Sequence, residues 1–212
     1  MKDLIIIGAS GFGREVAWLV ERINRINPTW NLIGFIDDNE SIIGTEINGY
    51  KVLGKISQYS EYPNAYFVCA VGSSKIRKQI VQRLVGAKFA TLVDPTVETS
   101  DSNTIGEGSI ICANTILTVN ITIGKHVIIN LDCTVGHDSV LRDFITLYPS
   151  VNVSGGANYG ECVELGTGSQ IIQYITIGKG TIVGAGSVVV KELPEECTAV
   201  GIPAKPIKFH EV

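Results

Sequence analysis

The chain has 212 residues, of which 45% are hydrophobic and 18% charged, with a formal net charge of -4. This balance is typical of a folded globular protein, and an acidic chain without a clustered basic face is not expected to bind nucleic acid or an anionic membrane. No stretch approaches the roughly 18 consecutive apolar residues of a membrane span, so we expect a cytoplasmic protein whose partners are small molecules.

Residues 1 to 93 have the pattern of a small Rossmann-like α/β domain. A short apolar run, Leu4 to Ile7, ends in a glycine-rich loop and is followed by apolar residues at helical spacing. Two further apolar runs, Leu32 to Ile36 and Tyr66 to Val71, end in polar residues or glycine, and a second helical pattern follows the latter. This alternation of strands and helices predicts a parallel sheet.

A nucleotide crevice is expected where these three runs end, because ligands of parallel α/β sheets bind across the carboxyl ends of the strands. Backbone amides at a helix start favour phosphate, and a carboxylate accepts hydrogen bonds from a ribose or a base. The glycine spacing differs from the dinucleotide fingerprint, so a tight turn that binds nothing is the alternative, and Asp38 could equally be a turn or cap residue. The candidate substrate-binding residues are Gly8, Ser10, Gly11, Gly13, Asp37 (the preferred contact), Asp38, Gly72 and Ser73.

From Ile105 to Val189 the sequence repeats every six residues, with an aliphatic side chain at the repeating position except at Tyr159. A six-residue period suits neither a helix nor an alternating strand, and it is typical of a parallel β-helix with three short strands in each 18-residue coil. A β-sandwich would space its turns about 8 to 12 residues apart. We place the domain boundary at Val93-Asp94-Pro95, so that residues 94–212 form the β-helix and a proline-containing tail.

His137 has the best surroundings for a general base among the three histidines. It lies at a corner of the repeat beside Asp138, and a neighbouring carboxylate orients an imidazole and stabilises its charged form. An 18-residue coil places Gly155 directly above His137, which leaves room for a substrate carbonyl and offers a backbone N–H to its developing negative charge. The alternative is a solvated corner histidine. His126 and His210 are expected at the surface.

A metal site is not expected in this sequence. His126 and His137 lie on different sides of a coil, so they do not provide the three converging ligands that a metal needs. The five cysteines have wide, irregular spacings that fit neither a disulfide framework nor a paired-cysteine zinc site, and we expect them to be reduced.

Five motifs together resemble those of one known family, although none of them is specific alone. They are Ile6-Ile7-Gly8-Ala9-Ser10-Gly11-Phe12-Gly13, Phe35-Ile36-Asp37-Asp38, Ala70-Val71-Gly72-Ser73 with Arg77, Gly136-His137-Asp138 within the hexads, and Val200-Gly201-Ile202-Pro203-Ala204-Lys205-Pro206. With these motifs the chain resembles, over nearly its whole length, the bacterial hexapeptide-repeat acyltransferases of the sialic acid O-acetyltransferase and UDP-4-amino-sugar N-acetyltransferase type.

The resemblance implies a left-handed β-helix, a homotrimer, acetyl-CoA bound in the groove between neighbouring β-helices, and a nucleotide-linked amino sugar held by the front domain. It also implies roles for single residues. His137 resembles the base that removes a proton as the sugar amine attacks the thioester, and Asp138 its acidic partner. Asn130 matches an asparagine of the catalytic motif, Gly155 a glycine whose amide faces the thioester carbonyl, and Ala185 a backbone contact to the pantetheine arm.

Thr146 departs from the family pattern, because the amino-sugar enzymes can carry a second histidine nine residues after the base. A threonine can hydrogen-bond a ligand but cannot act as a base near neutral pH, so we place Thr146 with the cofactor-binding residues and leave the acceptor open.

The function predicted from the sequence is acetyl-CoA-dependent N-acetylation of a nucleotide-linked 4-amino-deoxysugar. One alternative is a sugar O-acetyltransferase of the sialic acid type, which would leave the nucleotide crevice without a ligand. Another is a non-catalytic trimeric nucleotide-sugar-binding protein. An NAD-linked oxidoreductase is ranked last, because the β-helix would then have no purpose.

Overall fold

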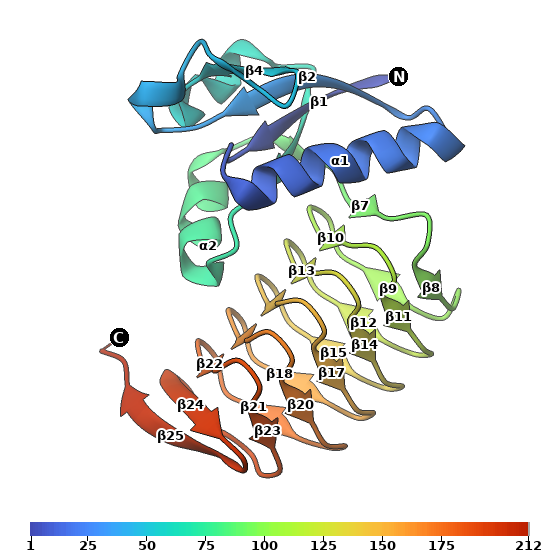
Figure 1. The fold of residues 1–212 in the computed structure, drawn as a ribbon, viewed down its shortest axis with the longest axis vertical. Helices are drawn as coiled ribbons and strands as arrows, with labels where there is room; N and C mark the ends of the chain where they lie inside the picture. Colours follow the sequence, from blue (N-terminus) through green and yellow to red (C-terminus); the bar gives the residue numbers. More distant parts are fainter. Residues whose placement is uncertain (212) are drawn as a thin grey trace.

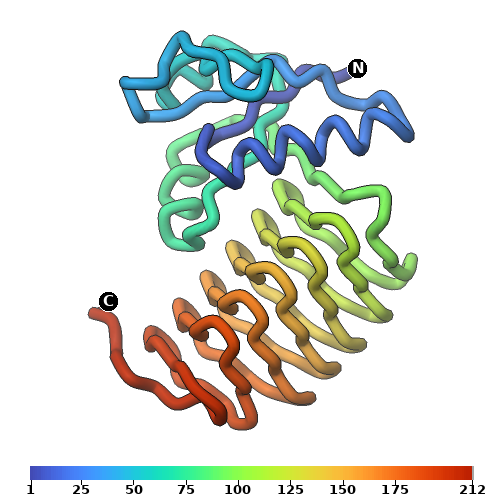
Figure 2. The backbone as a smooth tube through the Cα atoms, in the orientation of Figure 1, coloured from blue at the N-terminus to red at the C-terminus, as the bar shows by residue number. Residues whose placement is uncertain are grey.

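The computed structural model describes residues 1–211, in which a six-stranded sheet with two helices lies above a long β-helix (Figure 1). The coils of the β-helix follow one another from the front domain down to the C-terminal hairpin (Figure 2). This arrangement confirms the predicted pairing of a Rossmann-like N-terminal sheet with a C-terminal left-handed parallel β-helix.

The front sheet has the strand order β3-β4-β2-β1-β5-β6. Strand β1 pairs in parallel with β2 and β5, as the sequence predicted, whereas β3 pairs antiparallel with β4. The hairpin of β3 and β4 was not predicted. The strands are β1 (Lys2–Ile7), β2 (Trp30–Ile36), β3 (Glu46–Ile47), β4 (Tyr50–Gly54), β5 (Tyr66–Cys69) and β6 (Lys88–Phe89).

Helices cover both faces of the front sheet because successive side chains of β1 point to opposite faces. Leu4 and Ile6 pack against α1 (Gly11–Ile26), and Ile5 and Ile7 pack on the face covered by α2 (Ser74–Arg83). Two short 3-10 helices, η1 (Glu40–Ile42) and η2 (Ile56–Glu61), complete the domain. No helix among residues 1–211 is long and apolar enough to cross a membrane.

Three sheets form the β-helix, and before the last coil each strand residue pairs with the residue 18 positions further along, as Ile110 does with Ile128. The repeating aliphatic positions are buried in one continuous core. The first sheet contains β7 (Leu92–Val93), β10 (Ile110–Ile111), β13 (Ile128–Ile129), β16 (Thr146–Leu147), β19 (Glu164–Leu165), β22 (Ile182–Val183), β24 (Cys197–Gly201) and β25 (Ala204–Phe209). The second contains β8 (Glu98–Thr99), β11 (Ile116–Leu117), β14 (Thr134–Val135), β17 (Asn152–Val153), β20 (Gln170–Ile171) and β23 (Val188–Val189). The third contains β9 (Thr104–Ile105), β12 (Thr122–Ile123), β15 (Val140–Leu141), β18 (Asn158–Tyr159) and β21 (Thr176–Ile177).

The β-helix starts earlier than the visible repeat. Strand β7 already pairs with β10, and β8 pairs with β11. The repeat is hidden in this first coil because Thr99 occupies a position where an aliphatic residue is expected. Strand β7 therefore belongs to the β-helix although it lies at the expected boundary, and the limits of the two domains stay a prediction.

Arg77 of α2 joins the front domain to the β-helix. Arg77 is only 1% exposed. Within the front domain, Nη1 donates to the carbonyl oxygens of Val71 (2.7 Å) and Gly72 (3.0 Å). Toward the β-helix, Nε and Nη2 donate to the carbonyl oxygens of His126 (2.9 Å), Phe144 (2.8 Å) and Ile145 (3.0 Å) and to Oγ1 of Thr146 (3.0 Å). Burial lowers the pKa of Arg77 to about 10, so the guanidinium stays charged at neutral pH.

A second link joins α1 to the start of the β-helix. Arg22 binds the carboxylate of Asp94 through Nε (2.5 Å) and Nη2 (3.0 Å), and Asp94 also accepts hydrogen bonds from the backbone and hydroxyl of Thr96. Burial acts to raise the pKa of Asp94, but the bonds from Arg22 and Thr96 outweigh it and hold this pKa below its ordinary value. The two domains are thus connected by hydrogen bonds at two separate places.

The expectation that His126 lies at the surface was wrong. Its residue is only 5% exposed, and its ring stacks on Phe144 at a centroid distance of 5.2 Å and meets the edge of Phe89 at 4.6 Å. The front domain covers this corner, which the sequence of the repeat alone cannot reveal. Burial first, and then the charge of Arg77, lower the pKa of His126 to about 4.

Replacing Arg77 with methionine is expected to lower the free energy of unfolding by about 3 kcal/mol. The change removes the donors from several buried carbonyl groups, and each buried group without a partner costs about 1 to 3 kcal/mol. Arg83→Met is the matched control, since Arg83 is exposed on the same helix, and its effect should stay within about 0.5 kcal/mol. Equal denaturation midpoints for the two variants would contradict the role given to Arg77.

Acid is expected to destabilise the protein through His126. The folded-state pKa of about 4 lies below the ordinary value of 6.5, so the unfolded chain takes up the proton first and stability falls as the pH drops from about 6.5 to 4. Between pH 7 and pH 5 this contribution is about 2 kcal/mol. In His126→Phe, which keeps an aromatic ring, the loss of stability between these two pH values should be smaller by that amount. Urea unfolding at both pH values measures it, and parallel curves would refute the assignment.

Candidate active site

His137 and Asp138 form an exposed pair at the corner between the second and third β-helix sheets. The corner follows β14, and Asp138 turns the chain there with a φ of 58°. Nδ1 of His137 lies 2.8 Å from Oδ2 of Asp138, while Nδ2 of Asn120 donates to the other carboxylate oxygen at 3.2 Å. Both hydrogen bonds lower the pKa of Asp138, and the bond with His137 has the larger effect. A carboxylate fixed on Nδ1 leaves Nε2 of the imidazole free to take a proton.

Gly155 lies against the imidazole, one coil further along, as the 18-residue register predicted. A Cβ atom added to Gly155 would be 2.6 Å from Nε2 of His137, and the neighbouring Gly156 N–H donates to the His137 carbonyl oxygen at 2.7 Å. Among residues 1–211, the Gly155 N–H itself finds no hydrogen-bond acceptor. The corner therefore combines a base and an unused backbone donor.

Asn130 and Ala185 lie at a different corner of the same chain. Asn130 follows β13 and Ala185 follows β22, so both lie where the first sheet leads into the second. Oδ1 of Asn130 accepts a hydrogen bond from the Leu131 N–H at 2.7 Å. One chain thus does not bring Asn130 or Ala185 next to His137.

Thr146 is not available to a cofactor in this structure, which corrects the expectation from the sequence. The residue is 1% exposed, and its hydroxyl donates to the Gly72 carbonyl oxygen at 2.7 Å and accepts from Arg77. Thr146 therefore connects the front domain to the β-helix. His210, expected at the surface, is partly buried and lies 2.8 Å from the Thr198 hydroxyl.

The ends of β1, β2 and β5 meet at one edge of the front sheet, as predicted. Oδ2 of Asp37 accepts from the Ala9 N–H (2.8 Å), and a Cβ added to Gly8 would touch Ala70 and Val71. Both oxygens of Asp37 are bonded to backbone N–H groups, so this carboxylate shapes the glycine loop.

The candidate glycines of the first loop divide into two kinds. Gly8 and Gly13 are buried and pack together, because a Cβ on Gly13 would collide with the Gly8 carbonyl oxygen. Ser10 and Gly11 are exposed at the start of α1 and remain accessible to a ligand. Gly13 is therefore needed for close approach of helix and strand, which is a role in packing.

A hollow of about 340 Å³ beside Asp38 was not foreseen from the sequence. Its walls come from η2 and α2, and one oxygen of Asp38 accepts from the Ile56 N–H at 3.0 Å. Sequence patterns did not indicate this hollow, because η2 is a short 3-10 helix whose residues show no helical periodicity. The lining residues are Asp38, Ile56, Ser57, Tyr59, Ile80, Arg83 and Leu84.

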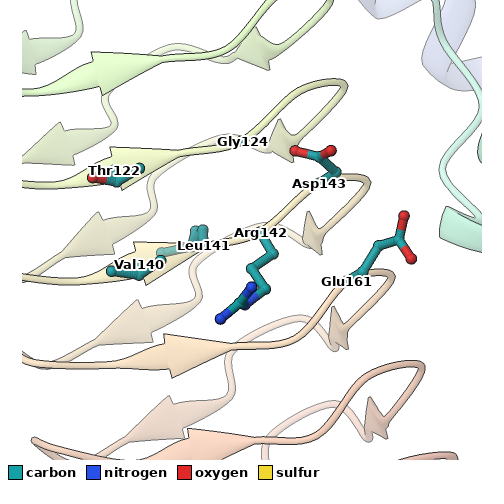
Figure 3. A pocket seen from close by; sticks show the side chains of 7 residues that line it. All are labelled: Thr122, Gly124, Val140, Leu141, Arg142, Asp143 and Glu161. Atoms are coloured by element: carbon teal, nitrogen blue, oxygen red, sulfur yellow. The ribbon is translucent and has the colours of Figure 1, made fainter.

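Another hollow, of about 510 Å³, lies on the outer face of β12 and β15 (Figure 3). The Arg142 side chain extends away from Asp143 and Glu161, and Glu161 forms an ion pair with Lys78 at 2.7 Å (Figure 3). None of the candidate site residues lines this hollow, and its lining residues include no histidine or cysteine. We assign no chemistry to it.

The described residues gather neither metal-ligating side chains nor exposed thiols into one place. No group of three or more His, Cys, Asp or Glu side chains within residues 1–211 is arranged to hold a metal ion. All five cysteines are buried and free, and burial is the main cause that raises the pKa of the thiols of Cys69, Cys112, Cys133 and Cys162.

Known proteins share both parts of this fold. Residues 3–84 match the family described as the PglD N-terminal domain. The acetyltransferase domain of PglB from Neisseria gonorrhoeae FA1090 is 33% identical, with a TM-score of 0.90 over 98% of this chain and 100% of that chain. A variant of perosamine N-acetyltransferase from Caulobacter crescentus, in complex with CoA and GDP-perosamine, is 28% identical, with a TM-score of 0.86 over 98% of each chain.

Curated relatives match over shorter stretches. Serine acetyltransferase from Buchnera aphidicola subsp. Schizaphis graminum is 36% identical over 83 residues, which are 35% of this chain and 32% of that protein. The matched stretch spans at most 44% of the length of the first such relatives. The similarity to the PglB acetyltransferase domain, in contrast, extends over both domains and confirms the resemblance seen in the sequence motifs, so the chain belongs to the hexapeptide-repeat sugar acyltransferases.

Proposed function

We propose that this protein transfers an acetyl group from acetyl-CoA to the amino group of a nucleotide-linked 4-amino-deoxysugar. The observation that carries the proposal is the His137–Asp138 pair beside the unbonded Gly155 N–H. Structures of similar proteins contain acetyl coenzyme A in one case and CoA with GDP-perosamine in another, which supports both substrates.

The corner residues can perform each step of the transfer. The sugar amine attacks the thioester carbonyl carbon, and Nε2 of His137 removes the proton that the amine loses. Asp138, bonded to Nδ1, keeps the imidazole oriented and stabilises its charged form. The Gly155 N–H donates to the oxyanion of the tetrahedral intermediate. When the C–S bond breaks, the imidazolium returns the proton to the departing thiolate, which gives CoA and the acetamido sugar.

A homotrimer would bring the two corners of the β-helix together. His137 lies at one corner, and Asn130 and Ala185 lie at another. A neighbouring copy is therefore needed to place His137 in a common groove with Asn130 and Ala185. Closed cyclic assemblies with repeated identical interfaces are common among oligomers, and three copies around one axis give three such grooves. A monomeric solution mass would contradict this part of the proposal.

The front domain is proposed to hold the nucleotide. Ser10, Gly11 and Ser73 are accessible at the starts of the two helices, where backbone N–H groups favour phosphate. The hollow beside Asp38 combines apolar walls with the carboxylate of Asp38 and the guanidinium of Arg83, which suits a base or ribose that makes hydrogen bonds. A sugar attached to this nucleotide would extend past Gly72 toward the β-helix.

Release of free thiol from acetyl-CoA tests the proposed reaction. We expect turnover with a member of a panel of UDP-, dTDP- and GDP-linked 4-amino sugars, and a fall in kcat of about 100- to 10,000-fold in His137→Ala. Free sialic acid serves as the alternative acceptor. Turnover with it alone would indicate an O-acetyltransferase, absence of thiol release with every acceptor would indicate a binding protein, and undiminished turnover in the variant would exclude His137 as the base.

Gly155→Ala should disturb catalysis without disturbing the fold. The added Cβ would lie 2.6 Å from Nε2 of His137, so the ring must move, and a displacement of about 1 Å at a reacting group can cost about 100-fold in rate. Ser154→Ala is the matched control, because Ser154 is exposed on the same corner. We expect kcat to fall in the first variant only, with the melting temperature of both close to native. Equal kcat values would show that the ring and Gly155 do not act together.

A further inference from the structure

Tyr148 lies where the front domain meets the corner that carries Asn130. It directly follows β16 and is displaced from Asn130 by one 18-residue coil, so the two residues occupy equivalent places in successive coils. A Cβ added to Gly72 would lie 3.7 Å from the Tyr148 hydroxyl oxygen. The phenol therefore reaches the loop that closes the predicted nucleotide crevice, and Gly72, without a side chain, leaves the approach open.

Glu164 of β19 holds this tyrosine in place. Its Oε2 accepts a hydrogen bond from the Tyr148 hydroxyl at 3.1 Å. Its Oε1 accepts from the backbone N–H of Ser74 at 2.7 Å and lies 2.8 Å from the Ser74 hydroxyl. One carboxylate thus fixes both the phenol and the first turn of α2, and the three groups form a connection between the nucleotide loop and the β-helix.

The pair is suited to receive a hydrogen-bond donor. Burial first, and then the charge of Glu164, raise the pKa of Tyr148 to about 12, so the phenol stays protonated and its hydrogen is directed at the carboxylate. The oxygen of a phenol that donates to a carboxylate keeps lone pairs with which to accept. The negative charge of Glu164 also favours a positively charged group nearby. An amino group on a sugar ring can meet both requirements and a sugar hydroxyl group meets the first, whereas a phosphate meets neither.

We propose that Tyr148, held by Glu164, positions the sugar ring of the nucleotide-linked substrate by accepting a hydrogen bond from its amino or hydroxyl group. This inference rests on the proposed function. A nucleotide in the front domain places its sugar beside Gly72, and the reacting nitrogen must travel from there to the groove at the Asn130 corner. Tyr148 is half-buried between these two places. It is a positioning residue, distinct from the base and from the phosphate-binding loop.

Tyr148→Phe tests the assignment, because it removes the hydroxyl and keeps the ring. With the nucleotide-linked 4-amino sugar on which the native protein is active, we expect the KM for the sugar nucleotide to rise about 3- to 10-fold, the loss of one hydrogen bond. The KM for acetyl-CoA should not change. Calorimetry should show the same weakening for the sugar nucleotide and none for the matching nucleoside diphosphate alone. Tyr62→Phe is the matched control, because Tyr62 precedes β5 whereas the Gly72 loop follows the other end of this strand.

A second variant, Glu164→Gln, separates orientation from charge. It removes the negative charge and leaves one acceptor oxygen, which can serve either Tyr148 or the Ser74 N–H. Relative to native protein, we expect the affinity for the 4-amino sugar nucleotide to fall more than the affinity for the corresponding 4-hydroxy sugar nucleotide. An equal fall for both would contradict a role for the charge of Glu164.

The outcomes distinguish this inference from the proposed function. No thiol release by native protein with any acceptor would overturn the proposed function before any variant is measured. Native turnover with unchanged sugar-nucleotide affinity in Tyr148→Phe would overturn the role of Tyr148 and leave the reaction standing. Equal weakening of the diphosphate and the sugar nucleotide would also overturn it, because that result marks a merely structural contact to the loop.

Discussion

Every other feature of the β-helix depends on the hydrogen-bond register between successive coils. Ile110 donates to Val127, Ile128 donates to Ile145, and the same step recurs down all three sheets. Because each strand from β7 to β23 has only two residues, one inserted residue would move an inward side chain to the outside and break the core. The register also fixes the candidate site, since Gly155 can lie against the His137 ring only when the two residues are separated by a full coil.

The front domain is attached to this rigid repeat through a buried cation. Arg77 is surrounded by carbonyl oxygens and the Thr146 hydroxyl, and each planar N–H group of its guanidinium points at an acceptor in one of the two domains. Desolvation of a charge is costly, and here several hydrogen bonds offset it. The result is a fixed position of the Gly72 loop relative to the Asn130 corner, which loose contacts between domains would not provide.

The hexad pattern predicts the β-helix well because one local period determines both burial and pairing. It predicts the position of Gly155 for the same reason. It fails at Thr99, a polar residue that is exposed in the first coil, and at His126 and Thr146, whose burial depends on the docked front domain. Docking is decided by long-range contacts such as those of Arg77, and neither composition nor spacing carries them. Roles for Glu164 and Tyr148 were not predicted for the same reason. Glu164 contacts Ser74, and Tyr148 approaches Gly72, only because the front domain is docked on the β-helix.

The separation of the His137 corner from the Asn130 corner decides which copies of a trimeric enzyme would bind the acceptor and which would remove its proton. The front domain of a chain is docked at the corner between the third and first sheets and reaches the Asn130 corner through Gly72 and Tyr148, while His137 lies at the corner between the second and third sheets. In the proposed assembly, the chain that binds the nucleotide therefore presents the attached sugar to His137 of a neighbouring copy. In that arrangement acceptor recognition and proton removal would reside on different copies, and a front domain that tilted against its own β-helix would move the amine away from His137 of the neighbouring copy.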